Sequence, residues 1–135
     1  SVVFCRTKNT TRWLTKALKK NGIKAETLNG DMSQHQREST VEEFKEGKFR
    51  VIVATDVAAR GLHIDDVSHV FNYDLPDKVD TYTHRVGRAG RQGAEGEAIS
   101  LLSKKDHQKF RRIKRKKDGI ERFGRDMDFV NAKTP

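Results

Sequence analysis

The sequence predicts an α/β fold in which a mostly parallel sheet is covered by helices on both faces. Stretches rich in apolar and β-branched residues alternate with segments of helical periodicity along the chain. The connections between them are short, as expected when a helix links neighbouring parallel strands. The chain has 135 residues, which suits one domain around a single core.

The predicted strands are short apolar or β-branched stretches, most of them bounded by Gly, Asn, Asp or Pro. They cover residues 2–5, 25–28, 50–55, 69–73 and 97–102. Ligands of parallel sheets bind at the carboxyl ends of the strands. We therefore expect the functional residues to follow these strands directly.

The first predicted helix is capped by Asn9 or Thr10 and stops at Gly22. It places four apolar side chains on one face: Trp13, Leu14, Ala17 and Leu18. Because this face is apolar, we expect Trp13 in the core rather than exposed as a platform for base stacking.

The second predicted helix opens with a capping box formed by Ser33 and Gln36, and it runs to Gly47. Residues 80–87 predict a further helix, and the basic segment from Lys104 predicts the last one. Residues 118–135 lose periodicity and predict a partly ordered C-terminal tail. The domain is therefore expected to span residues 1–117.

The positive charge of the chain is concentrated near its C-terminal end. The formal net charge is +9, and residues 104–117 hold nine Lys or Arg against one Asp. A local concentration of this kind indicates a surface that faces nucleic acid, although a solvated helix can also carry it. Its density favours a salt-sensitive contact with nucleic acid.

The composition argues against several other classes of protein. No apolar run approaches the roughly 18 residues of a membrane span, and no signal-peptide pattern is present. Cys5 is the only cysteine, so no internal disulfide can form, and a reducing, cytoplasmic location is expected. The five histidines show no metal-ligand spacing. The chain begins inside an apolar strand without methionine, and we expect a fragment of a longer polypeptide.

A stretch rich in arginine and glycine, residues 84–91, gives the strongest chemical signal. Arg85, Arg88 and Arg91 recur at every third position, with Gly87 and Gly90 between them. The planar guanidinium group donates paired hydrogen bonds to phosphate, and glycine permits a close approach of the backbone. Taken alone, the stretch fits either a polyphosphate clamp or a solvated basic helix end.

Four stretches together resemble the motifs of DEAD-box RNA helicases, in the family's order and spacing. The matching stretches are residues 2–7 for motif IV, 29–37 for segment IVa, 54–62 for motif V and 84–91 for motif VI. The chain is thus similar to the second, C-terminal RecA-like domain of such an enzyme. The resemblance implies a RecA-like, P-loop NTPase-type fold that lacks its own P-loop.

The resemblance also implies roles for individual residues. Positions matching Arg88 and Arg91 act as catalytic arginine fingers on ATP held by another domain. The full set of residues expected near the nucleotide is His63, Asp65, Arg85, Arg88 and Arg91. The residues expected to bind single-stranded RNA are Arg6, Thr7, Gly30, Asp31, Arg37 and Thr55. The residues expected at the interface between domains are Gln34, Arg60, His84 and Arg85.

His63 departs from the family pattern, which usually has aspartate at this position. In the resembled family that aspartate contacts the nucleotide ribose and orients the arginine fingers. A mostly neutral imidazole can bind a ribose hydroxyl, but it cannot hold an arginine as a carboxylate does. We expect weaker ATP binding or turnover, or partial substitution by Asp65.

The sequence contains neither a G-x-x-x-x-G-K-[ST] P-loop nor an acidic Asp-Glu-Ala-Asp box. We therefore expect ATP and Mg²⁺ to be held mainly by an N-terminal RecA-like domain outside this chain, and the isolated domain to be inactive. The expected whole is an ATP-dependent RNA helicase whose partners are RNA, that N-terminal domain and protein regulators, with no membrane. The alternative is a non-catalytic module that binds RNA or protein; a DNA helicase domain fits the motifs less well.

Overall fold

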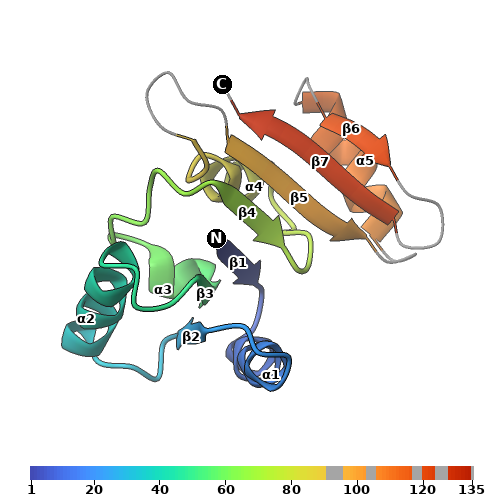
Figure 1. Ribbon diagram of the computed structural model, residues 1–135. Helices are drawn as coiled ribbons and strands as arrows, with labels where there is room; N and C mark the ends of the chain where they lie inside the picture. The colour runs from blue at the N-terminus through green and yellow to red at the C-terminus, as the bar shows by residue number, and fades with distance from the viewer. Residues whose placement is uncertain (91–95, 103–105, 117–119, 124–127, 135) are drawn as a thin grey trace. The chain divides into compact units, whose positions relative to one another are not determined.

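A computed structural model describes residues 1–90, 96–102, 106–116, 120–123 and 128–134 of the protein (Figure 1). The chain forms two compact units, Ser1–Ile64 and Asp65–Pro135. We call them unit 1 and unit 2. No helix among the described residues combines the length and the apolar character that crossing a membrane requires.

Unit 1 is built from three parallel strands and three helices in strict alternation. The elements are β1 (Val2–Cys5), α1 (Lys8–Lys20), β2 (Ala25–Leu28), α2 (Gln34–Lys45), β3 (Val51–Thr55) and α3 (Asp56–Ala59). The strand order is β2-β3-β1, so the central strand is β3. Cys5 pairs with Thr55, and Leu28 pairs with Ala54, so the three strands end at nearly the same level.

The core of unit 1 lies on its strands, most of whose residues are buried. The buried strand side chains include Val2, Phe4, Cys5, Ile52 and Val53. Near-continuous burial of this kind is typical of parallel strands covered on both faces. The thiol of Cys5 is buried among them.

The helix starts of unit 1 differ in how well the sequence predicted them. The predicted capping box of α2 is confirmed, because the Gln36 amide donates to Ser33 Oγ at 3.1 Å and the Ser33 amide donates to Gln36 Oε1 at 2.9 Å. The predicted caps of α1 were wrong. Its cap is Thr7, whose side chain accepts a hydrogen bond from the Thr10 amide at 3.3 Å.

The predicted burial of Trp13 was also wrong, since its side chain is 60% exposed. The buried stripe of α1 instead contains Thr11 and Thr15. Thr15 Oγ1 donates to the Thr11 carbonyl at 2.7 Å and accepts from Thr27 Oγ1 at 2.8 Å. Because these hydroxyls find partners inside the protein, they can be buried at little cost, and Trp13 is left on the solvent side of the helix.

Unit 2 contains parallel and antiparallel pairs. The elements are β4 (His69–Asn72), α4 (Val79–Val86), β5 (Gly96–Leu102), α5 (His107–Lys116), β6 (Ile120–Phe123) and β7 (Asp128–Thr134). β4 pairs with β5 in parallel, whereas β7 runs antiparallel to both β5 and β6 (Figure 1).

The predicted α/β class with a mostly parallel sheet is confirmed, and two strands occur where the sequence shows no periodicity. The domain boundary at residue 117 stays a prediction.

A buried arginine connects three elements of unit 2. Arg85 on α4 is 1% exposed, and its Nη1 donates to the Asp74 carbonyl at 2.7 Å and to Asn72 Oδ1 at 3.4 Å. Its Nη2 lies 3.6 Å from the Asp74 carboxylate. Asn72 in turn donates to Ser100 Oγ on β5 at 2.8 Å. This network joins α4 to the ends of β4 and β5.

Replacing Arg85 with alanine should lower the free energy of unfolding by about 3 kcal/mol, because Asn72 and Asp74 lose a charged donor in a buried place. Arg88→Ala is the matched control. Its ion pair is partly exposed, so the cost should be about 0–1 kcal/mol. Urea denaturation of both variants measures the difference, and equal costs would contradict the structural role of Arg85.

Candidate functional site

The carboxyl ends of the strands of unit 1 bring predicted site residues from three motifs to one edge. Arg6 and Thr7 follow β1, Gly30 and Asp31 lie in the turn after β2, and Thr55 ends β3. In the sequence, these residues lie up to 49 positions apart. The in-register parallel pairing is what assembles them, as the sequence analysis expected for this type of sheet.

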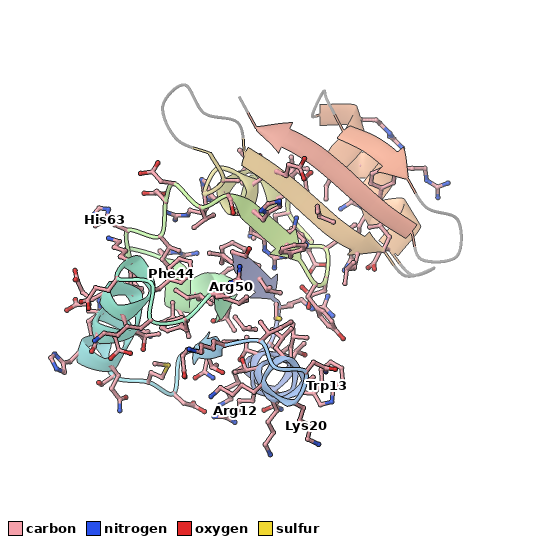
Figure 2. The ribbon with its side chains drawn as sticks, viewed as in Figure 1. Arg12, Trp13, Lys20, Phe44, Arg50 and His63 are labelled. Carbon is pink, nitrogen blue, oxygen red and sulfur yellow. The ribbon has the colours of Figure 1, made fainter. Side chains whose placement is uncertain are left out.

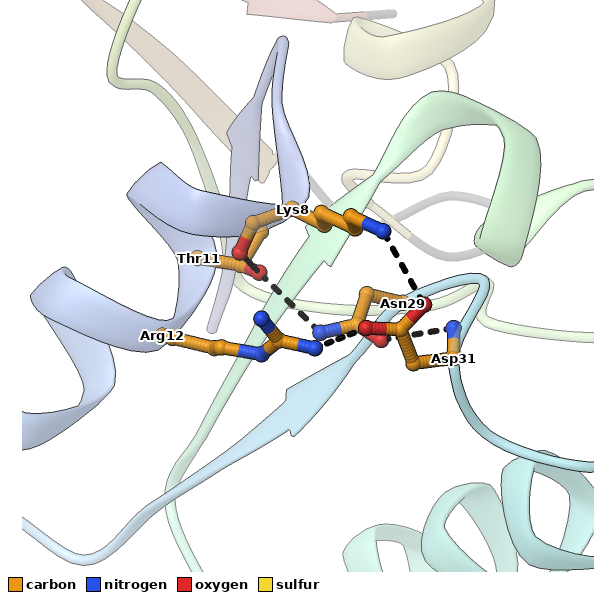
Figure 3. A network of polar contacts seen from close by, with 5 residues as sticks. All are labelled: Lys8, Thr11, Arg12, Asn29 and Asp31. Atoms are coloured by element: carbon orange, nitrogen blue, oxygen red, sulfur yellow. Dashed lines mark hydrogen bonds and ion pairs between the residues drawn. The ribbon is translucent and has the colours of Figure 1, made fainter.

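The turn after β2 is organised by Asn29, a residue that the sequence analysis did not include among the site residues. Asn29 is buried, its Oδ1 accepts a hydrogen bond from the Asp31 amide at 2.9 Å, and its carbonyl accepts one from the Met32 amide at 3.2 Å. Its amide group also donates to Thr11 Oγ1 at 3.5 Å (Figure 3). The Asn-Gly-Asp sequence is a turn signal that points to such an arrangement.

Gly30 lies exposed at the tip of this turn. A Cβ atom at Gly30 would meet nothing within 4 Å. The glycine is therefore not required by packing inside the fold. The open space allows an external group to approach the backbone closely.

Asp31 is held by two cations of α1 (Figure 3). Lys8 Nζ lies 3.2 Å from Asp31 Oδ1, and the Arg12 guanidinium donates to Oδ2. All three side chains are about half exposed. The carboxylate thus supplies negative charge beside the first turn of α1, which has no acidic residue of its own. Neither Lys8 nor Arg12 was among the predicted site residues.

Thr7 and Thr55 both use their hydroxyl groups as helix caps. Thr55 Oγ1 accepts a hydrogen bond from the Ala58 amide at 3.3 Å, as Thr7 Oγ1 does from the Thr10 amide. A capping role therefore exists at both positions, and it orients the first turns of α3 and α1. Thr55 Oγ1, which accepts from an amide, still has a proton to donate to another group. Thr7 Oγ1 also shares a hydrogen bond with Thr10 Oγ1 at 2.8 Å.

Two predicted residues of α2 contact each other rather than lying apart. Arg37 Nη2 donates to Gln34 Oε1 at 2.8 Å, and Gln34 Nε2 donates to Glu38 Oε1 at 3.2 Å. The predicted RNA-binding arginine and the predicted interface glutamine thus form one chain of side chains on the first turns of the helix. Their assigned roles stay predictions.

The loop after α3 presents Arg60 and His63, both exposed, on either side of a tight turn at Gly61. Gly61 has φ +77°, a conformation that side chains rarely adopt. The loop and α2 together line a pocket of about 530 Å³ (Figure 2 labels His63). Charged or titratable groups lining the pocket are His35, Glu38, Glu42, Lys45 and His63.

In unit 2, Arg88 is held by a carboxylate at a short distance. Arg88 Nη1 donates to Asp65 Oδ1 at 3.0 Å, and the arginine side chain is 25% exposed. The backbone around it is fixed as well, because the Val67 amide donates to the Arg88 carbonyl at 3.2 Å. A second backbone hydrogen bond joins the same two segments, from the Gly90 amide to the Val67 carbonyl at 2.8 Å.

Gly96, at the start of β5, packs directly on this segment. A Cβ atom at Gly96 would lie 2.7 Å from the Ala89 carbonyl carbon and 2.8 Å from Gly90 Cα, which real Cβ atoms do not show. The absence of a side chain is therefore a packing requirement here. It allows β5 to support the backbone that follows Arg88.

The three predicted arginines of residues 84–91 differ in their environments. The Arg85 guanidinium binds Asn72 and Asp74, Arg88 is partly exposed, and Arg91 lies outside the described residues. His84 is exposed on the last turn of α4. Burial raises the pKa of Tyr82 on the same helix to about 12.

Helix α5 carries much of the predicted basic patch. Phe110 and Ile113 are buried, and Lys109 pairs with Asp77 at 2.6 Å. The exposed cations whose side chains the structure describes are Arg111, Arg112 and Arg115. Within the described part of the chain, no three His, Cys, Asp or Glu side chains are grouped in a way that could hold a metal ion.

Comparison with known proteins identifies the family. Residues 1–93 match the model of the helicase conserved C-terminal domain. The chain is 47% identical over 115 residues to the ATP-dependent RNA helicase RhlB of Pseudomonas syringae, which covers 85% of this chain and 29% of that protein. A second relative, the ATP-dependent RNA helicase SrmB of Haemophilus influenzae, is also 47% identical, over 84% of this chain and 26% of its own length.

Solved structures give the same result. The E. coli DEAD-box protein SrmB, bound to regulator of ribonuclease activity A, matches with a TM-score of 0.83 at 44% identity, over 87% of this chain and 69% of that one. The C-terminal domain of the DEAD-box protein Dbp5 matches with a TM-score of 0.82 at 37% identity, over 89% of this chain and 71% of that one. The chain spans less than a third of the length of the two curated relatives. It belongs to the helicase conserved C-terminal domain family, in the form found in DEAD-box RNA helicases.

Proposed function

We propose that this chain is the second RecA-like domain of an ATP-dependent RNA helicase. In this proposal, unit 1 binds the backbone of single-stranded RNA, and unit 2 supplies arginine fingers to ATP held by an N-terminal domain. The observation that carries the proposal is the common edge of β1, β2 and β3, where residues of three motifs gather.

The chemistry of this edge suits a phosphate backbone. Gly30 offers an exposed backbone without a side chain in the way, and Thr7 and Thr55 offer hydroxyl groups at helix N-termini. Arg37 on the neighbouring helix uses one of its five N–H donors on Gln34, which leaves others for a phosphate. None of these groups reads base edges, so the binding should be independent of sequence.

The guanidinium group of Arg88 is held in a fixed orientation and is still accessible to a phosphate. Asp65 and the neighbouring backbone orient its guanidinium, yet a quarter of the side chain stays exposed. This supports the substitution of Asp65 for the aspartate that the family usually has at position 63. Arg91 is proposed as the second finger. Arg85 binds groups of its own unit, which supports a positioning role through α4.

The donor groups on the described residues fit the phosphates of ATP better than the metal. Guanidinium groups match phosphate oxygens, whereas the described residues offer no cluster of carboxylates for Mg²⁺. We therefore assign the metal and most of the nucleotide contacts to the N-terminal domain. His63 is proposed to contact the ribose, beside the carboxylates that line its pocket.

The exposed cations of α5 extend the proposal. Arg111, Arg112 and Arg115 lie on the solvent side of a helix without acidic residues. They would add a salt-sensitive, sequence-independent contact with RNA. Protein regulators are a further class of proposed partner, since the E. coli relative was solved bound to another protein, regulator of ribonuclease activity A.

One observation favours a second candidate function. The exposed His63 stands where the resembled family usually has a carboxylate, so the chain would also fit a module that binds RNA or protein with reduced or absent ATPase activity. An RNA-stimulated ATPase assay on the full-length protein separates the two functions, because the second one predicts no turnover while RNA binding is retained.

Arg88→Ala should reduce RNA-stimulated ATP hydrolysis by the full-length protein by about 10³-fold or more, since an arginine finger stabilises charge in the transition state. RNA affinity should change little. Arg50→Ala removes an exposed arginine from unit 1 and serves as the matched control. Retained turnover in Arg88→Ala, with normal RNA binding, would contradict the finger assignment.

His63→Asp should lower the KM for ATP of the full-length protein by about threefold to tenfold, because a carboxylate accepts a charge-assisted hydrogen bond from a ribose hydroxyl. His35→Asp introduces the same change into the lining of the same pocket and serves as the control. ATPase kinetics that are unchanged in His63→Asp would exclude the proposed ribose contact.

A further inference from the structure

The solvent side of α1 has an unusual composition for a helix surface. Its exposed residues are Lys8, Asn9, Arg12, Trp13, Lys16, Lys19 and Lys20. The 13 residues of the helix include no aspartate or glutamate. Five cations and one exposed tryptophan therefore share one surface, and nothing in the proposed function above uses Trp13.

Part of this charge is neutralised by other elements of unit 1, and part is not. Asp31 pairs with Lys8 and Arg12, and Glu26 pairs with Lys19 at 3.5 Å. Within the described residues, neither Lys16 nor Lys20 takes part in an ion pair. The charge that remains available thus lies on the side of the helix that also carries Trp13.

Asn9, Trp13, Lys16 and Lys20 follow a spacing of four, three and four residues, which aligns them along one side of a helix. Figure 2 shows Trp13 and Lys20 projecting from α1 away from the strands. From Asn9 to Lys20 the row extends about 16 Å along the helix axis. We call these four residues the α1 row.

The chemistry of the α1 row favours RNA over a protein partner. An exposed aromatic ring offers a face on which a base can stack, and lysines beside it attract phosphates. The core of a protein interface is instead depleted in lysine and enriched in apolar contacts. The neighbours of Trp13 along the row are polar or cationic, so the surface is better matched to a nucleic acid strand.

The α1 row is also connected to the edge where RNA binding is proposed. Thr7, a residue of that edge, caps α1, and Lys8 and Arg12 bind Asp31 in the turn after β2 (Figure 3). A strand that leaves the edge can therefore continue along α1 within the same unit.

We infer that the α1 row is an accessory binding site for single-stranded RNA, in which Trp13 stacks on a base and Lys16 and Lys20 contact phosphates. This inference rests on the proposed RNA-binding function and extends it. The site lengthens the RNA segment that unit 1 contacts. It adds no sequence preference beyond what stacking supplies, because every base has a face for the ring.

Trp13 itself provides the test, since it is the only tryptophan of the 135-residue chain. Two oligouridylates are titrated into the chain, a short one that covers the strand-end edge and a second one longer by about four nucleotides. The longer RNA should quench the Trp13 emission, and the short RNA should not. Binding of each is measured in parallel by the anisotropy of a dye on the RNA.

Trp13→Ala should weaken binding of the longer RNA by about tenfold and leave binding of the short one unchanged. Trp13→Phe should restore much of the affinity, because a smaller ring still stacks. Lys16→Ala combined with Lys20→Ala should make the slope of log K against log salt less negative by about 0.7 per lost phosphate contact. Lys24→Ala, an exposed lysine directly before β2, is the control.

The outcomes separate this inference from the function on which it rests. If both RNAs bind but neither quenches Trp13, and Trp13→Ala binds both with normal affinity, the inference is overturned and the edge is retained. If the parent chain binds neither RNA, both the inference and the RNA-binding role of unit 1 are overturned.

Discussion

The in-register parallel pairing of β1, β2 and β3 is the constraint on which the candidate site depends. Because Cys5 lies opposite Thr55 and Leu28 lies opposite Ala54, the segments that follow the strands emerge at one level. A shift of two residues in either pairing would keep the buried faces but move one motif about 7 Å away from the others. The buried side chains of these strands specify the register, so packing in the core sets the geometry of the surface.

Two arginines that are three residues apart show how environment divides roles within one motif. Arg85 faces the end of β4, where Asn72 and Asp74 bind its guanidinium group, while Arg88 lies beyond the helix against Asp65. The spacing in the sequence is regular, but helix α4 ends between them at Val86. Arg85 therefore stabilises the segment. Arg88 is held in a fixed orientation by the same segment and stays partly exposed.

The order and approximate bounds of the first five strands and of the helices at residues 34–45 and 79–86 could be predicted from apolar patterning and turn residues. The remaining differences have physical causes. Thr15 is buried because Thr27 binds its hydroxyl, a tertiary contact that patterning cannot show, and Trp13 is displaced to the surface as a result. β7 depends on pairing with β5, so its own sequence carries little signal. In the candidate site, the sequence motifs indicated Gly30 and Asp31. The roles of Asn29, Lys8 and Arg12 are visible only in the structure, from the contacts that these three residues make with Asp31.

The proposed contact of the carboxyl ends of β1, β2 and β3 with the RNA backbone can be tested by amide chemical-shift mapping of the isotopically labelled chain with a short oligouridylate. The largest shifts should fall on Thr7, Gly30, Asp31 and Thr55, and the same residues should respond to a short oligocytidylate. Shifts confined to other elements, or their absence at these four amides under saturating RNA, would contradict it.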